Sequence, residues 1–312
     1  MTLDKYEQDV GKMKYIDRKG NVTIEETEHD KFLRHLYTDW GGKICLKLLI
    51  SPFVSKAVSI FLKSKVSARM IPGFISKNKI VMSDYEETVY HSFHDFFVRK
   101  FQPQARPVAK GERTLISPCD GKATVARIDR NLRFFINDTE YAVPQVLRSN
   151  TIARHYAGGY VVLIRMTMED CHHYCYVAEG VKSSNVVLNG KLHAVNGAAN
   201  DHFPIYEENT REYSLLQTPH MGTIVMMEVS ALFAAQISNL HKGPRKVEKG
   251  QPKGHFEFDG SAVVLFIQPD KVRMDYDLIE NSENGYETII RMGERIGEQK
   301  LPKRVRKINP EQ

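Results

Sequence analysis

The spacing of hydrophobic residues along this chain changes near residue 109. Before that point they recur at helical intervals, and after it they form short runs separated by turn residues. The runs that predict strands are 114–117, 122–128, 133–136, 160–166, 186–188, 223–229 and 262–267. Residues 142–149 predict a short helix among them. The pattern indicates an α+β fold, in which a helical lead-in, residues 1–108, precedes a mostly-β core, residues 109–312.

The lead-in combines apolar residues at helical spacing with many lysines. Residues 32–40 repeat at that spacing, and the runs 44–50 and 53–63 lie on either side of Pro52. Lysines recur at positions 43, 47, 56, 63 and 65. Because a membrane span needs about 20 predominantly apolar residues, the lysines and the proline argue against one. Two short basic amphipathic helices lying in a membrane interface fit the pattern, and a soluble helical hairpin packed on the core fits it equally well.

Smaller elements are expected at both ends of the chain. Residues 1–30 are polar, with Gly20 and Asn21 as turn formers, which predicts a small hairpin or a loosely ordered segment. Residues 91–101 predict a short helix whose aromatic side chains lie in the core. The basic tail from Lys300 is expected to be disordered.

Composition narrows the class of protein. A chain of 312 residues with 42% hydrophobic and 26% charged residues can bury a full core. The net charge of +6 suits an anionic partner or a solvated basic surface. Four cysteines without an apolar export signal argue for a reducing compartment and against a disulfide scaffold. The sequence has neither a phosphate-binding loop nor a dinucleotide fingerprint, and we expect no nucleic-acid partner.

The residues around Ser261 allow two interpretations. The run 256–258 enters a turn at Asp259 and Gly260, and the apolar run 262–267 leaves it. A hairpin or β-bulge accounts for this pattern. Alternatively, a strained turn holds the Ser261 hydroxyl near the carbonyl of Gly260, where the absence of a side chain leaves that carbonyl open to attack.

Two further segments carry groups that can react. The segment 117–121 reads Ser-Pro-Cys-Asp-Gly, which is typical of a surface turn. The segment 169–176 reads Glu-Asp-Cys-His-His-Tyr-Cys-Tyr, and in a strand it would place His172 and Tyr174 on the face opposite Cys175. The spacing is too regular for a zinc knuckle and no second cysteine pair follows, so we expect no metal. The density of titratable groups favours a reactive site instead.

Taken in chain order, segment 117–121, segment 169–176 and the segment around Ser261 resemble those of the phosphatidylserine decarboxylases. The likeness extends over about residues 32–297. Its further motifs are Phe96-Phe97-Val98-Arg99-Lys100, Arg106-Pro107, Val195-Asn196, Glu228-Val229, Lys249-Gly250 and the run from Lys253 to Ser261. The resemblance implies a β-rich catalytic core that carries N-terminal membrane-binding helices.

The resemblance also implies a self-processing enzyme. The proenzyme would cut itself between Gly260 and Ser261 into a β chain, residues 1–260, and an α chain, residues 261–312. The Ser261 hydroxyl would attack the preceding carbonyl, and elimination from the resulting ester would leave a pyruvoyl group in place of Ser261. This group would form a Schiff base with phosphatidylserine and accept electrons as carbon dioxide leaves, giving phosphatidylethanolamine.

Individual residues take roles from the same resemblance. Asp120 matches the acidic member of the self-cleavage relay. His172 matches the first histidine of the family's Asp-Tyr-His-Arg-x-His motif, which is linked to decarboxylation, but the second histidine, the relay base, falls on Cys175. A thiol acts as a base only in its thiolate form. Three explanations are therefore open: His172 or His173 is the base, self-cleavage is slow, or the strained turn needs less base catalysis. Asp259 and Ala262 also depart from the usual Gly-Gly-Ser-Thr pattern.

The expected partners follow from an anionic lipid substrate. We expect peripheral binding to an anionic surface on the cytoplasmic side of the cell membrane, and a heterodimer of the two chains, with a homodimer of that unit left open. Two alternatives stay in play. One is a relative that decarboxylates a soluble amino acid. The other is an uncleaved, catalytically weak protein that binds anionic lipid.

Overall fold

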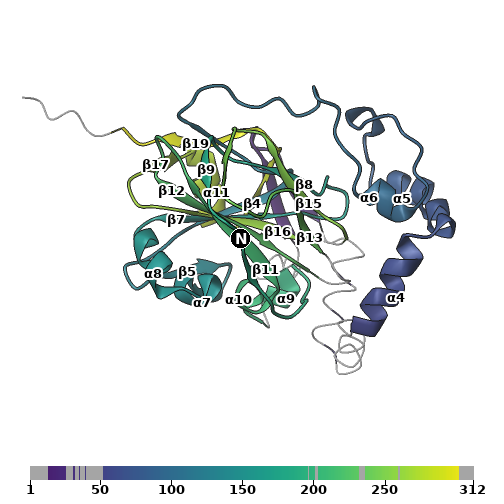
Figure 1. The fold of residues 1–312 in the computed structure, drawn as a ribbon, viewed down its shortest axis with the longest axis horizontal. Helices are drawn as coiled ribbons and strands as arrows, with labels where there is room; N and C mark the ends of the chain where they lie inside the picture. The colour runs from purple at the N-terminus through teal and green to yellow at the C-terminus, as the bar shows by residue number, and fades with distance from the viewer. Residues whose placement is uncertain are drawn as a thin grey trace, which may run out of the picture.

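The computed structural model describes residues 13–25, 52–195, 197–200, 203–231, 236–258 and 261–301, together with Lys31, His35 and Asp39. Its main element is an 11-stranded mixed sheet, beside two three-stranded sheets and one two-stranded sheet (Figure 1). The α+β class with a mostly-β core is therefore confirmed. In the lead-in run 32–50 only His35 and Asp39 are described, and the tail from residue 302 also lies outside the described residues.

The large sheet has a continuous path of ten strands. In spatial order these are β14 (Arg245–Val247), β9 (Gly180–Lys182), β11 (Arg211–Gln217), β12 (Thr223–Val229), β16 (Ala262–Ile267), β7 (Tyr160–Arg165), β4 (Gly121–Arg127), β18 (Glu287–Ile290), β1 (Met13–Asp17) and β2 (Val22–Glu25). β10 (Val186–Leu188) pairs with β11 outside this path. Most neighbours are antiparallel, and β1 is parallel to β18.

β16 occupies the middle of this sheet, and its composition explains why. All six of its residues are buried. Val264 and Phe266 pack in one hydrophobic core, and Val263 and Leu265 pack in a second core on the opposite face. A strand covered on both faces needs apolar side chains at every position, which accounts for the unbroken run that the sequence shows.

The face of Val263 and Leu265 is covered by a three-stranded sheet. This smaller sheet consists of β13 (Ile237–Asn239), β15 (Pro252–Phe256) and β8 (His173–Cys175), with β15 in the centre. Tyr174 and Phe256 from these strands lie in the same core as Val263. The chain therefore passes from one packed sheet to the other between β15 and β16, across the roughly 10 Å that separates packed sheets.

The remaining strands and helices surround this sandwich. The other small sheets contain β17 (Val272–Met274), β19 (Arg295–Gln299) and β3 (Thr114–Ile116), and β5 (Arg133–Ile136) with β6 (Thr139–Ala142). The helices of the core are α7 (Val143–Leu147), α8 (Asn150–Ala153), α9 (Gly197–Asn200), α10 (Ile205–Glu208) and α11 (Tyr276–Glu283). The predicted helix at 142–149 contains α7, and α8 begins directly after the predicted range.

The N-terminal hairpin is part of the large sheet. β1 and β2 pair antiparallel around Gly20, whose positive φ of 89° suits the turn. Arg18 fixes the hairpin to the core through ion pairs of 2.8 Å with Asp275 and 2.7 Å with Asp277. The predicted hairpin is confirmed, and the core sheet includes residues that a domain boundary at 108 would assign to the lead-in.

The described helices of the lead-in form a separate cluster. α4 (Pro52–Leu62) runs downward in Figure 1 from α5 (Ile71–Lys77) and α6 (Phe93–Phe97). α6 buries its aromatic side chains, as the sequence predicted, in a small core with Ile71. At the C-terminal end of α4, Ile60 and Phe61 are 63% and 47% exposed. In the described part of the chain, no helix is long and apolar enough to cross a membrane.

Candidate active site

Ser261 lies where the chain enters the large sheet. It is buried immediately before β16, and its carbonyl accepts a 2.8 Å hydrogen bond from the amide of Met166. This bond continues the register in which Ala262 lies opposite Arg165. Because side chains alternate along a strand, Ser261 is on the face of Val263, toward the three-stranded sheet. Its hydroxyl is therefore held inside the sandwich.

The segment before Ser261 does not form a hairpin. β15 pairs with β8 and β13, whereas β16 pairs with β7 and β12, so the flanking strands belong to different sheets. The incoming strand ends at Phe256 rather than covering 256–258, because the next residues leave the small sheet to reach the large one. Phe258 packs against His94 and Phe97, with ring centroids 4.8 and 6.1 Å apart. Asp259 and Gly260 lie outside the described residues.

Asp120 is buried beside β4 and not in the surface turn that its motif suggested. Arg106 binds its carboxylate through two nitrogens, with Nε 2.9 Å from Oδ1 and a terminal nitrogen 2.7 Å from Oδ2. The amide of Met292 also donates to Oδ1, at 2.8 Å. Burial raises the pKa of Asp120, and Arg106 opposes that rise. β4 is two strands from β16, so the backbones of Asp120 and Ser261 are about 10 Å apart, which suits an electrostatic or positioning role.

His172 is fully buried and carries an available lone pair. Its Nδ1 lies 3.1 Å from the carbonyl oxygen of Asp170. Because a carbonyl only accepts hydrogen bonds, this contact assigns the proton to Nδ1 and leaves Nε2 unprotonated. Nε2 has no hydrogen-bond partner among the described residues. The ring packs 4.2 Å from that of Phe97, and burial lowers the pKa of His172 to about 3, so the imidazole is neutral.

The neighbouring candidates, His173 and Cys175, both contact backbone carbonyl oxygens. His173 Nε2 lies 2.9 Å from the carbonyl oxygen of Val98, and burial lowers the pKa of His173 to about 4. The Cys175 thiol lies 3.9 Å from the carbonyl oxygen of Ser117, and burial raises its pKa to about 12. Cys175 is consequently a protonated thiol at neutral pH. Of His172, His173 and Cys175, only His172 has a buried ring nitrogen without a hydrogen-bond partner among the described residues.

The structure also reveals cations that orient His172. Arg99 donates to the carbonyl oxygens of Glu169 and Asp170, at 2.8 and 3.3 Å. Lys122 donates to the Asp170 carboxylate at 2.8 Å. Together they fix the turn whose carbonyl holds His172 Nδ1. Arg99 belongs to the motif Phe96-Phe97-Val98-Arg99-Lys100, but nothing in the sequence connected its charge to His172.

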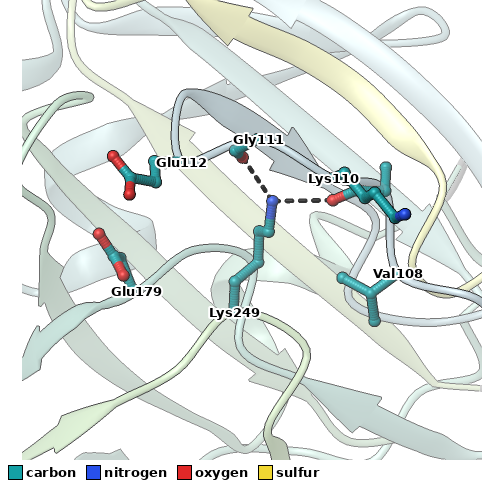
Figure 2. A pocket seen from close by; sticks show the side chains of 7 residues that line it. Val108, Lys110, Gly111, Glu112, Glu179 and Lys249 are labelled. Carbon is teal, nitrogen blue, oxygen red and sulfur yellow. Dashed lines mark hydrogen bonds between the residues drawn. The ribbon is translucent and has the colours of Figure 1, made fainter.

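A pocket of about 300 Å³ lies elsewhere, around Lys249 (Figure 2). The Lys249 ammonium donates to the carbonyl oxygens of Ala109 and Gly111, at 2.8 and 2.6 Å. Glu112 and Glu179 line the same pocket. None of the predicted catalytic residues lines it, and its lysine already binds the chain. Among the described residues, no group of histidine, cysteine and acidic side chains is arranged to hold a metal ion.

Comparison with known proteins identifies the family. A sequence model described as phosphatidylserine decarboxylase matches residues 93–298. The chain belongs to the phosphatidylserine decarboxylase family. The match includes Asp120, His172 and Ser261, and it confirms both the resemblance seen in the sequence and the expectation of an enzyme family.

Curated members of the phosphatidylserine decarboxylase family match nearly the whole chain. A phosphatidylserine decarboxylase proenzyme 2 of Clostridium acetobutylicum is 39% identical over 267 residues, covering 85% of this chain and 91% of that protein. A phosphatidylserine decarboxylase proenzyme of Chlamydia caviae is 32% identical over 292 residues, covering 92% and 98%. One from Clostridium novyi is 32% identical over 291 residues, covering 91% and 99%.

Proposed function

We propose that this chain decarboxylates phosphatidylserine by means of a pyruvoyl group that it makes from Ser261. The observation that carries the proposal is the burial of Ser261 at the crossover between two sheets, close to a neutral histidine. The proximity rests on the amide of Phe256, which donates to the His172 carbonyl at 3.0 Å, and on Phe97, which packs against both His172 and Phe258. The names of the relatives, phosphatidylserine decarboxylase proenzymes, support the same reaction and a precursor form.

The surroundings of Ser261 fit a reactive carbonyl group. The site is buried, and two polar atoms near it, His172 Nε2 and Glu228 Oε1, are buried without hydrogen-bond partners among the described residues. Such unpaired atoms mark a place for a polar ligand. A pyruvoyl group supplies a ketone that condenses with a primary amine and accepts the electron pair released when carbon dioxide leaves.

His172 is our candidate base for self-cleavage. Its Nε2 takes the proton from Ser261 Oγ, and Oγ forms a bond to the carbonyl carbon of Gly260. The peptide C–N bond breaks, and the proton passes to the departing nitrogen. Arg106 and Asp120 form a buried ion pair near this end of the sheet, and its electric field acts on the cleavage site. Cys175 replaces the family's second histidine without supplying a base, because burial raises the pKa of its thiol.

The two products of cleavage would stay together. The smaller one, residues 261–312, contains β16, β17, β18 and β19. β16 lies between β7 and β12, and β18 lies between β4 and β1, so each is hydrogen-bonded on both sides to the larger product. A heterodimer of the two chains follows from this interleaving.

We also propose that the lead-in binds an anionic membrane surface peripherally, on the cytoplasmic side of the cell membrane. Ile60 and Phe61 offer exposed apolar side chains, and Lys56 and Lys63 are exposed on the same helical segment. Such a combination allows apolar insertion and attraction to anionic headgroups.

The proposed reaction is tested with purified protein and vesicles containing phosphatidylserine. We expect conversion to phosphatidylethanolamine with release of carbon dioxide, and no conversion by the Ser261→Ala variant. Free serine serves as a second substrate, and preference for it would favour the soluble-substrate alternative. Lipid binding without conversion of either substrate would favour the non-enzymatic alternative.

A further inference from the structure

A buried ion pair near Ser261 takes no part in the steps above. Lys253 on β15 donates to Oε2 of Glu228 on β12 at 2.7 Å, and the two side chains are 1% and 0% exposed. Asn239 on β13 donates to the same oxygen at 3.1 Å and accepts from Lys253 at 2.9 Å. The group therefore joins the three-stranded sheet to the large sheet, inside the sandwich that contains Ser261.

One oxygen of this carboxylate is not used by the ion pair. Glu228 Oε1 is buried and has no hydrogen-bond partner among the described residues. The hydroxyls of Tyr176 and Ser214 are likewise buried and unpaired there. Tyr176 belongs to the core between the two sheets, and Ser214 lies opposite Met226, which belongs to the same core. Buried polar atoms are normally paired, so three such atoms in one region call for a polar partner.

The register places this free oxygen near the cut site. Glu228 lies opposite Val263 on β16, and Ser261 is two residues before Val263 on the same face. Diagonal neighbours of this kind are about 7 Å apart, within reach of a long side chain or a small ligand. Glu212, by contrast, lies opposite Glu228 on β11, one strand farther from β16.

We propose that Glu228 is the acid–base residue that receives the substrate's primary ammonium group and removes its proton. This assignment rests on the proposed function, in which that nitrogen attacks a ketone at position 261. An N–H bond breaks as an O–H bond forms on Oε1, and the nitrogen lone pair becomes free to attack. After attack, the former ketone oxygen would take this proton from Glu228 and a second proton from the attached nitrogen. Its bond to carbon would break as the carbon–nitrogen double bond forms, so that it leaves as water and the carboxylate is restored.

The groups around Glu228 suit this exchange. Lys253 faces it from β15, Glu212 from β11, Tyr174 from β8, and Tyr176 from the residue that directly follows β8. Burial raises the pKa of Glu228, while Lys253 acts in the opposite direction. A carboxyl group whose pKa lies nearer the working pH transfers protons readily in both directions. Lys253 meanwhile keeps the carboxylate in place through Oε2, away from the oxygen that exchanges the proton.

The test compares the Glu228→Gln variant with the wild-type holoenzyme. The probe is glycerophosphoserine with cyanoborohydride, and the readout is the mass of the small chain after the amine has been trapped on it. We expect the variant to cleave itself into two chains but to trap the amine about 100-fold more slowly at pH 7. We also expect its trapping rate to rise about tenfold per pH unit from pH 6 to 8, since only unprotonated amine reacts. The wild-type rate should depend less on pH.

Two further variants make the result decisive. Glu212→Gln is the matched control and should trap the amine like wild type. The double variant Glu228→Gln/Lys253→Met removes both buried charges, so it should fold and self-cleave even if the single variant does not, and it should still trap slowly. The assignment would be overturned if self-cleaved Glu228→Gln trapped the amine as fast as wild type. It would also be overturned if Glu212→Gln trapped the amine as slowly as Glu228→Gln. So would failure of both Glu228 variants to self-cleave. An uncut wild-type chain would instead refute the proposed function, and this assignment with it.

Discussion

Burial sets the charge state of each candidate group near Ser261. His172 and His173 are neutral, because burial lowers their pKa values to about 3 and about 4. Cys175 is protonated, because burial raises its pKa to about 12. A neutral imidazole accepts a proton over the whole physiological range, whereas this thiol would have to ionise first. For this reason we propose His172, rather than Cys175, as the group that takes the proton from Ser261.

The first prediction is a flat pH profile for self-cleavage. With His172 as base, the cleavage rate should change less than about threefold between pH 6 and 9, since the imidazole is neutral throughout this range. With the Cys175 thiolate as base, the rate would rise about tenfold per pH unit. The rate is followed on denaturing gels after cell-free synthesis and transfer to each pH.

His172→Gln should slow cleavage about 100-fold. A log-linear rise with pH, abolished in Cys175→Ser, would assign the role to the thiol.

The second prediction concerns stability in acid. The pKa of His172 is lower in the folded state than the ordinary value of 6.5, so the unfolded chain binds more protons between about pH 6.5 and 3. Stability is then complete above pH 6.5 and falls as pH drops, by about 1.4 kcal/mol per pH unit for this group. In the uncut Ser261→Ala background, adding His172→Gln should reduce the pH slope of the unfolding free energy by that amount. Urea unfolding at pH 6, 5 and 4 measures it, with the exposed His155→Gln as control. An unchanged slope in His172→Gln would show that the imidazole is not buried neutral.

At the scale of elements, the crossover from β15 to β16 connects the site to the lead-in. Glu257, at the start of the crossover, pairs with Lys63, which directly follows α4, at 3.0 Å. The segment that carries the cut site is thus tied to the helix that we propose for the membrane. This arrangement would bring a lipid headgroup and Ser261 to the same side of the molecule.

The third prediction tests α4 as a membrane element. Burying one large apolar side chain contributes about 1.5–3 kcal/mol, so replacing the exposed Ile60 or Phe61 by aspartate should weaken binding to vesicles containing phosphatidylserine by tenfold or more. Self-cleavage should not change, because neither residue is in the core. Val89→Asp is the control, since Val89 is 74% exposed but lies outside α4. Sedimentation with vesicles measures the effect, and equal binding by all variants would remove α4 from the membrane contact.

At the scale of the whole molecule, the sequence predicted the buried strands better than the contacts between sheets. The run 262–267 matched β16 residue for residue, because a strand buried on both faces must be apolar throughout. β8 and β15 were not delimited, since their histidine, cysteine, lysine and glycine residues carry little strand propensity. The contacts of Glu228 with Lys253 and of Arg106 with Asp120 depend on which strands become neighbours. Pairings of that range are set by topology, which local patterns do not encode.

The most direct test of the account is the intact mass of the purified protein under denaturing conditions. The account predicts two species, residues 1–260 and a chain from position 261 to 312 whose N-terminus is blocked by a ketone that borohydride reduces. The Ser261→Ala variant should give one species of full length. A wild-type chain that stays uncut after long incubation with anionic vesicles would contradict the account.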